Sequence, residues 1–136
     1  MQARDGFRLQ WHFLRDDMTA ASGNELPWTE GEERTIEGEI TLCERGYHSS
    51  PTPWAALGYA NGSVLCLVEV SEPEGRDETK SVSRTRRLLR AINVKRELRL
   101  FACDEAEAAL TRECERGREP DPRSWVAIEV ARQYAY

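Results

Sequence analysis

The sequence has few of the residues and patterns that usually mark chemistry. It contains only two histidines, His12 and His48, and its four cysteines form no CxxC pair. It lacks the GxxxxGK(S/T) and GxGxxG phosphate loops and the GxSxG motif of hydrolases. These absences exclude the common nucleotide-binding and serine-hydrolase classes, and any histidine-dependent chemistry must use one of two side chains.

Long hydrophobic runs are also missing. No apolar run approaches the roughly 18 residues of a membrane span, and the N-terminal segment has no apolar signal core. We therefore expect a cytoplasmic protein without a membrane partner. Cys43, Cys66, Cys103 and Cys114 are expected to be reduced thiols. Cys43, His48 and Cys66 could converge, but their spacing is not that of zinc sites, so we expect no metal.

Charge is unevenly distributed along the chain. The net charge is -5, whereas the basic stretch 84–99 contains seven Lys and Arg residues and one acid, Glu97. Arg86 and Arg90 fall one turn apart on a predicted helix, where they could hold a phosphate or a carboxylate. No aromatic residue interleaves them, so the stacking platform of a single-strand nucleic-acid binder is missing. Nucleic acid is therefore a partner that the sequence allows but does not favour.

The first half of the chain reads mainly as strands. Alternation over 7–14 and 35–43 and a continuous apolar run over 63–70 predict three strands, the last of them central. A short capped helix is expected over 52–60. The connection 16–34 has no sustained period, and we expect a turn at 22–24 and a core position for Trp28.

The second half reads mainly as helices. Helical spacing predicts helices over 81–92, 95–117 and 124–136. The expected fold class is α+β: a small mixed, mainly antiparallel sheet with an inserted short helix and C-terminal helices packed on it. We expect a single domain over 1–136, with 1–72 mainly strands and 81–136 mainly helical.

The strand over 7–14 also orients a histidine. Phe7, Leu9, Trp11 and Phe13 share one face, which we assign to the core. His12 then points to the opposite face, where a ligand would lie.

The corner Gly46–Ser50 is the candidate site. It joins a predicted strand to the short helix, and its structural interpretation is that Gly46 makes a tight turn, Tyr47 fills the core and Ser50 caps the helix. The alternative is a ligand pocket between this corner, His12 and the polar turn before residue 81. The candidate catalytic residues are His12, Tyr47 and Glu78, and the candidate ligand-binding residues are His48, Ser49, Ser50, Tyr59, Lys80, Arg84 and Arg87.

The corner and its surroundings resemble a family of small uncharacterised phage and bacterial proteins. Members have a Cys-Glu-x-Gly-aromatic-His-Ala-Ser/Cys corner, and the resemblance spans roughly residues 9–102. The matching positions are Cys43, Glu44, Gly46, His48, Ser50, Tyr59, Ala60 and Lys80, while Ser49 replaces the usual alanine. The resemblance implies the fold and assigns no reaction.

A second resemblance is to ADP-ribosyltransferase-like domains, which use NAD. It implies that His12 holds the cofactor ribose, that Tyr47 or Ser49 lines the nicotinamide pocket and that Tyr59 packs behind it. The stabilising glutamate would be Glu69 or Glu78. Such an acid acts best in a dry, preorganised pocket.

The preferred hypothesis is a small intracellular binding protein that uses no cofactor and takes a protein or a small anionic ligand as its partner. The first alternative is an NAD-using, ADP-ribosyltransferase-like enzyme. The second is a nucleic-acid-binding protein that uses the basic stretch 84–99.

Overall fold

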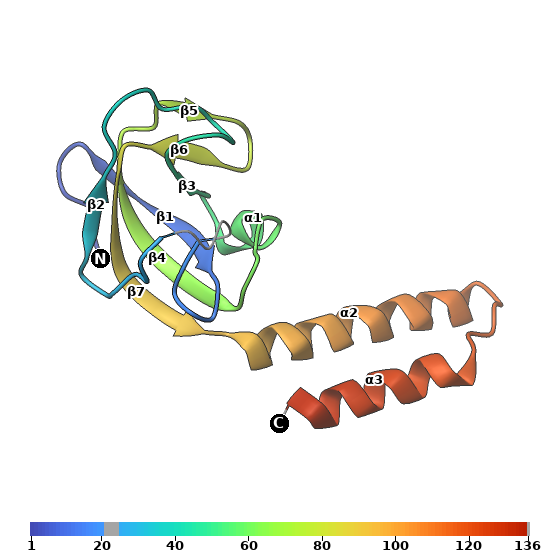
Figure 1. The fold of residues 1–136 in the computed structure, drawn as a ribbon. Helices are drawn as coiled ribbons and strands as arrows, with labels where there is room; N and C mark the ends of the chain where they lie inside the picture. Colours follow the sequence, from blue (N-terminus) through green and yellow to red (C-terminus); the bar gives the residue numbers. More distant parts are fainter. Residues whose placement is uncertain (21–24, 136) are drawn as a thin grey trace. The chain divides into compact units, whose positions relative to one another are not determined.

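A computed structural model describes residues 1–20 and 25–135 (Figure 1), and the turn predicted at 22–24 lies outside them. The chain divides into two compact units, Met1–Asn93 and Val94–Tyr136. Each unit is taken by itself, and the predicted single domain and the packing of the helices on the sheet stay predictions.

Seven strands and one short helix form the described part of the first unit, and two long helices form that of the second. Their bounds are β1 (Phe7–Leu14), β2 (Glu33–Thr35), β3 (Tyr47–Ser49), α1 (Pro53–Leu57), β4 (Val64–Ser71), β5 (Gly75–Arg76), β6 (Ser81–Ser83), β7 (Thr85–Asn93), α2 (Lys95–Glu115) and α3 (Pro122–Ala135). The combination of antiparallel strands and helices confirms the α+β class.

The larger sheet has the strand order β1-β4-β7-β2, and all its neighbours are antiparallel. β4 is central, as its continuous apolar run predicts. Trp28, from the connection before β2, is 3 % exposed and completes the core, which confirms its predicted place. The core residues are Leu14, Trp28, Val64, Cys66, Val68, Val70 and Leu88.

The core face of β1 is the opposite of the predicted one. His12 pairs with Cys66, and Leu14 pairs with Val64. Directly opposed residues of antiparallel strands project to the same face, so His12 shares the face of the core. Side chains on both faces of β1 are buried or half-buried, and alternation alone could not tell which face the core covers.

The smaller sheet has the order β3-β6-β5, and α1 packs against β1 (Figure 1). α1 lies within the predicted range 52–60. The Thr52 hydroxyl accepts the N–H of Ala55 at 3.0 Å, and Pro53 occupies the first turn, as a capped helix start requires.

The strand predicted over 35–43 is wrong beyond its first residue, where β2 ends. Arg84 donates to the carbonyls of Ile36 and Gly38 at 2.9 and 2.8 Å. The Arg45 guanidinium binds two further carbonyls of this segment. Because guanidinium groups take these acceptors, the segment needs no neighbouring strand to satisfy its backbone.

The helix predicted over 81–92 is also wrong, because this segment forms β6 and β7. β7 pairs with β4 on one side and β2 on the other. Arg86 and Leu88 are buried, whereas Ile92 is 62 % exposed. A buried arginine breaks the apolar–polar alternation that identifies a strand, and the remaining apolar residues then mimic helical spacing.

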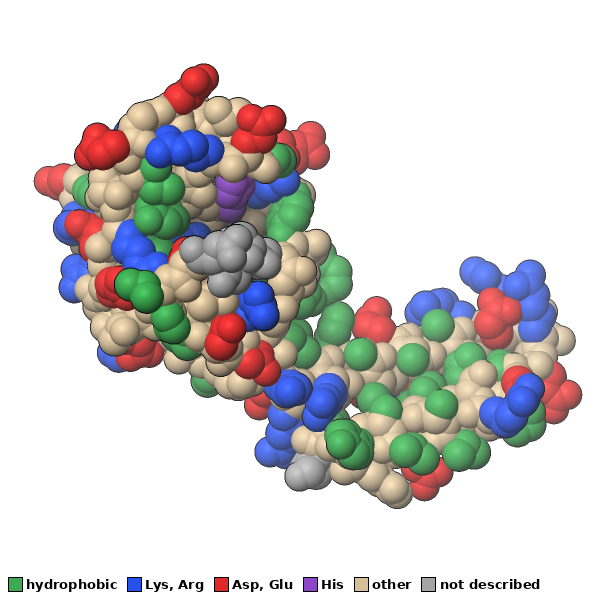
Figure 2. Space-filling view, viewed as in Figure 1, with side chains coloured by type: hydrophobic (Ala, Val, Ile, Leu, Met, Phe, Trp, Pro, Cys, Tyr) green, Lys and Arg blue, Asp and Glu red, His purple; other side chains and the backbone are tan. Residues whose placement is uncertain are grey.

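The second unit is a hairpin of α2 and α3, which confirms two of the predicted helices. Cys103 of α2 is buried, and Arg132 of α3 pairs with Asp104 at 2.8 Å. Hydrophobic side chains also lie on the face of this unit drawn in Figure 2. Val126 and Val130 of α3 are exposed. Within residues 1–20 and 25–135, no helix has the length and apolar character needed to cross a membrane.

α3 begins at Pro122, before the predicted start of this helix at residue 124. The Asp121 carboxylate accepts the N–H of Arg123 at 2.9 Å and so satisfies a donor of the first turn. An aspartate followed by proline is itself a common helix start.

Candidate functional site

The corner is fixed by a glycine and by two sets of strand bonds. Gly46 has φ +132, and a Cβ atom there would lie 2.3 Å from the Val82 side chain, so only glycine fits. β3 then pairs with β6. Ser50 exchanges backbone hydrogen bonds with Trp11 at 2.8 and 2.7 Å, which ties the corner to β1.

The turn before the corner holds His48 in place. Cys43 has φ 69, a left-handed conformation that is uncommon outside glycine. Its backbone N–H donates to Nε2 of His48 at 2.8 Å, so this nitrogen is an acceptor. Burial, followed by the positive charge of Lys80, lowers the pKa of His48. His48 is therefore a neutral structural link at neutral pH.

A cavity of about 530 Å³ opens between the corner, β1, α1 and the strand β7. Its size is that of an ordinary small-molecule site. The lining residues are His12, Phe13, Ala20, Glu25, Ile36, Cys43, Glu44, Gly46, Tyr47, His48, Ser49, Ser50, Ala56, Tyr59, Lys80 and Arg86.

Arg86 is the buried cation of this cavity. It is 3 % exposed, and its guanidinium carbon lies 4.7 Å from the ring centre of Trp28 and 4.9 Å from that of Tyr47. One of its N–H groups donates to the carbonyl of His48 at 2.9 Å. Burial lowers the pKa of Arg86 to about 10, which leaves the group charged at neutral pH.

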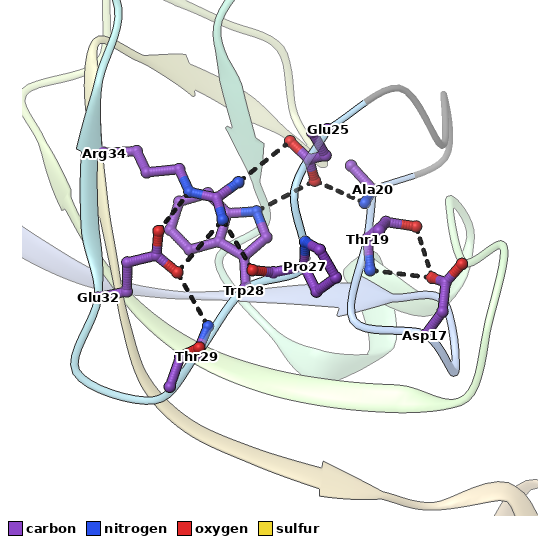
Figure 3. Close-up of polar contacts among 9 residues, drawn as sticks. All are labelled: Asp17, Thr19, Ala20, Glu25, Pro27, Trp28, Thr29, Glu32 and Arg34. Carbon is purple, nitrogen blue, oxygen red and sulfur yellow. Dashed lines mark hydrogen bonds and ion pairs between the residues drawn. The ribbon is translucent and has the colours of Figure 1, made fainter.

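No carboxylate in residues 1–20 and 25–135 forms an ion pair with Arg86. The nearby acid Glu25 raises the pKa of Arg86 by its charge. Its carboxylate is occupied elsewhere: it accepts from Ala20 N–H and Trp28 Nε1 and lies 3.7 Å from Arg34 (Figure 3). A buried charge without a partner is costly, and it usually means that another group completes the site.

Two further polar atoms beside the cavity lack partners. Nε2 of His12 and Oγ of Ser49 are buried and have no hydrogen bond to any residue that the structure describes. Burial, then the charges of Arg86 and His48, hold the pKa of His12 well below its ordinary value of 6.5, so His12 is neutral at neutral pH. Buried polar atoms normally have partners, so these two offer unused hydrogen-bonding capacity.

Lys80 and Tyr59 form the more exposed end of the cavity. The Lys80 ammonium lies 4.6 Å from the ring centre of Tyr59, and the Tyr59 hydroxyl hydrogen-bonds to Thr79. The Asp77 carboxylate accepts the N–H groups of Thr79 and Lys80 at 2.8 and 2.9 Å, which fixes the turn. The cavity therefore has cations at two depths.

The structure brings most of the sequence-predicted site residues together and leaves three outside. Those that line the cavity are His12, Tyr47, His48, Ser49, Ser50, Tyr59 and Lys80. Glu78 is exposed in the turn and does not line the cavity. Arg84 is engaged with backbone carbonyls and with Glu74 at 3.0 Å. Arg87 lies opposite Glu69, on the other face of the sheet from Arg86.

Sequence reasoning placed Arg86 on a helix, where with Arg90 it could hold a phosphate or a carboxylate, and left it out of the candidate site; it lies on the strand β7 instead. The available signal was its position two residues before Leu88, since a strand puts both on one face. Metal and thiol chemistry gain no support: no group of three or more His, Cys, Asp or Glu that could hold a metal is found in the described ranges. The four thiols are free, and burial raises the pKa of Cys66 to about 11.

The fold and the cavity define a small α+β protein whose first unit encloses a pocket around a buried, unpaired arginine. The chain belongs to a domain family of unknown function, DUF7666, whose sequence pattern matches residues 9–100. The match covers β1 through β7 and therefore includes the whole cavity. No curated protein and no solved structure matches the chain.

Proposed function

We propose that this protein is a binding protein for a small organic anion, and that Arg86 anchors the anion inside the cavity. One observation carries the proposal: a guanidinium that is 97 % buried has no carboxylate partner among the described residues and faces an open cavity. Of the five N–H donors of an arginine, one has an acceptor within the described ranges, the His48 carbonyl. A bound anion would supply both the charge and the missing acceptors.

The structural alternative is that Arg86 only stacks against Trp28 and Tyr47. Stacking with one hydrogen bond compensates a guanidinium poorly for the loss of water, and a neutral side chain of similar volume would fill the same space at lower cost. An arginine at this position is explained better by a ligand than by the stability of the fold.

The test is a thermal-shift titration with a panel of organic carboxylates and phosphates, performed on the wild type, Arg86→Gln and Arg34→Gln. Arg34 is the matched control, because it also lies against Trp28 but has carboxylate partners. A ligand of the native state raises the unfolding midpoint. The proposal expects a dose-dependent rise in the wild type and in Arg34→Gln, and none in Arg86→Gln. A rise that survives in Arg86→Gln contradicts it.

An NAD-using reaction is the second candidate, favoured by the fact that His12, Tyr47 and Ser49 line one cavity. The candidate glutamate does not fit, because Glu78 lies on the exposed turn. Glu69 is bound by Arg4 at 2.6 Å and does not line the cavity. This candidate expects that NAD, ADP-ribose or nicotinamide raises the unfolding midpoint of the wild type but not of His12→Ala or Tyr47→Ala. No shift at millimolar concentration contradicts it.

The corner motif also supports the proposal that the protein belongs to the phage and bacterial group described above. The nucleic-acid alternative has less support, since Arg84 and Arg86 of the basic stretch are engaged within the first unit. It predicts an affinity for nucleic acid that falls steeply with salt. Binding that does not change with salt would contradict it.

A further inference from the structure

The chemistry around Arg86 narrows the class of anion, if the proposed binding function holds. The buried end of the cavity supplies one positive charge. His12 is neutral there, and Ser49 adds only a hydroxyl group. The second cation, Lys80, lies against Tyr59 at the more exposed end. A ligand group that reaches Arg86 therefore meets a single positive charge.

A negative charge also lines this cavity. Glu25 interacts electrostatically with Arg86 without forming an ion pair with it. A group with two negative charges, such as a phosphate monoester, would keep one charge that Arg86 does not compensate, beside Glu25, whose own carboxylate is paired with Arg34 at 3.7 Å. A carboxylate has one negative charge, which Arg86 compensates.

The shape of the guanidinium also favours a carboxylate over a phosphate monoester. Arginine presents a planar set of donors that matches the two oxygens of a carboxylate. The terminal nitrogen Nη1 of Arg86 donates to the carbonyl of His48. Nε and Nη2 have no protein acceptor in the described ranges, and together they form the edge that binds a carboxylate through two parallel hydrogen bonds.

The rest of the ligand would contact apolar surface. Phe13, Ile36 and Ala56 line the cavity, together with the rings of Tyr47 and Tyr59. A volume of about 530 Å³ accommodates a ring-sized body, whose burial adds affinity in proportion to its apolar area.

We propose that the Arg86 site takes a monoanionic carboxylate carried on an apolar, ring-sized body and discriminates against phosphate monoesters. Ser49 Oγ and His12 Nε2, two buried polar atoms without partners in the described ranges, supply further hydrogen-bonding groups in the same cavity.

The experiment is isothermal titration calorimetry of the full chain with three probes: benzoate, phenyl phosphate and acetate, at a pH where phenyl phosphate is a dianion. Benzoate and phenyl phosphate share the ring and differ in charge and shape, whereas acetate keeps the carboxylate and lacks the ring. We expect benzoate to bind at least about tenfold more tightly than either of the others, and Arg86→Gln to remove its binding.

Three outcomes separate the failure of this inference from that of the proposed function. If phenyl phosphate binds as tightly as benzoate or more tightly, and Arg86→Gln removes both, the anion site stands and its preference for carboxylates is wrong. If acetate binds as tightly as benzoate, the apolar body adds no affinity and this part of the inference is wrong. If no probe binds in an Arg86-dependent way, and the panel of anions also fails, the proposed function falls as well.

Discussion

Two arginines lie against the ring of Trp28, and their surroundings differ. Arg34 is 4.1 Å from the ring centre and is held by Glu32 at 2.7 Å, by Glu25 and by the carbonyl of Pro27 (Figure 3). Arg86 is 4.7 Å from the same ring, is more deeply buried and has one carbonyl acceptor. The partners of Arg34 include two carboxylates, as expected of a structural arginine, whereas Arg86 has the His48 carbonyl and no carboxylate among the described residues.

The other face of the sheet supports this comparison. Glu69 of β4 is as buried as Arg86, at 3 % exposure, and it is bound by the guanidinium and the backbone N–H of Arg4. This fold therefore provides a partner for a buried charge where the charge serves structure. On the cavity face, Arg86 has no carboxylate partner among the described residues.

Trp28→Ala removes what the two arginines share and should have the largest effect. It creates a cavity in the core, so we expect the free energy of unfolding to fall by about 3–5 kcal/mol and benzoate binding to be lost. Urea denaturation measures the stability change. Trp54→Ala is the control, because Trp54 is 70 % exposed. Equal effects of the two substitutions would contradict the central place given to Trp28.

The two arginine variants should separate stability from binding. Arg34→Gln breaks ion pairs with Glu25 and Glu32, so we expect a loss of about 1–3 kcal/mol in the free energy of unfolding with benzoate affinity kept. Arg86→Gln removes an uncompensated buried charge, so we expect a stability change of less than about 1 kcal/mol with binding lost. The reverse pattern, in which Arg86→Gln is the more destabilising, would make Arg86 the structural arginine.

Acid pH should lower the free energy of unfolding through His12, which lines the same cavity as Arg86. The pKa of His12 is held below 6.5 in the folded protein by burial, Arg86 and His48. The unfolded chain therefore binds a proton more readily, and stability should fall as the pH drops below about 6.5, by at most about 1.4 kcal/mol per pH unit from this group.

His12→Asn should flatten this pH dependence. A smaller slope would remain, because the pKa of His48 is also lowered. Urea denaturation at pH 7.5, 6.5 and 5.5 measures the slope in both proteins. Identical slopes in the wild type and His12→Asn would contradict the assignment of a buried, neutral His12.

Two buried serines extend the comparison to neutral groups, with the smallest expected effects. Ser49 Oγ has no partner, so Ser49→Ala should leave stability unchanged or raise it by a few tenths of a kcal/mol, roughly, while it weakens benzoate binding. Ser83 Oγ donates to the carbonyl of Ser71 at 2.8 Å, so Ser83→Ala should cost about 1 kcal/mol. Thermal unfolding compares the two, and an equal loss in both would show that Ser49 is already satisfied.

The sequence predicted much of the first unit because several of its signals are local. The apolar run of β4, the cap at Thr52 and the tight turn at Gly46 each depend on neighbouring residues only. The sequence also predicted that the corner, His12 and Lys80 would surround one site. These residues do line one cavity.

The errors came from side chains that act over long distances. Arg84 satisfies carbonyls 46 and 48 positions earlier in the chain and so replaces a predicted strand. Arg86 is buried by Trp28 and Tyr47, which no local pattern brings near it. Sequence reasoning treats a basic residue as solvent-facing. For this reason it predicted a helix where β7 lies, and it chose Arg84 and Arg87 rather than Arg86 as the charged residues of the site.

The most direct measurement is a nitrogen–proton correlation spectrum of the arginine side chains, recorded during a benzoate titration. The Nε–H signals of Arg34 and Arg86 can be assigned from their loss in Arg34→Gln and Arg86→Gln. The account predicts that benzoate shifts the Arg86 signal, because its Nε–H donates to the ligand, and leaves the Arg34 signal in place. An unchanged Arg86 signal at saturating benzoate, or an equal shift of both signals, would contradict it.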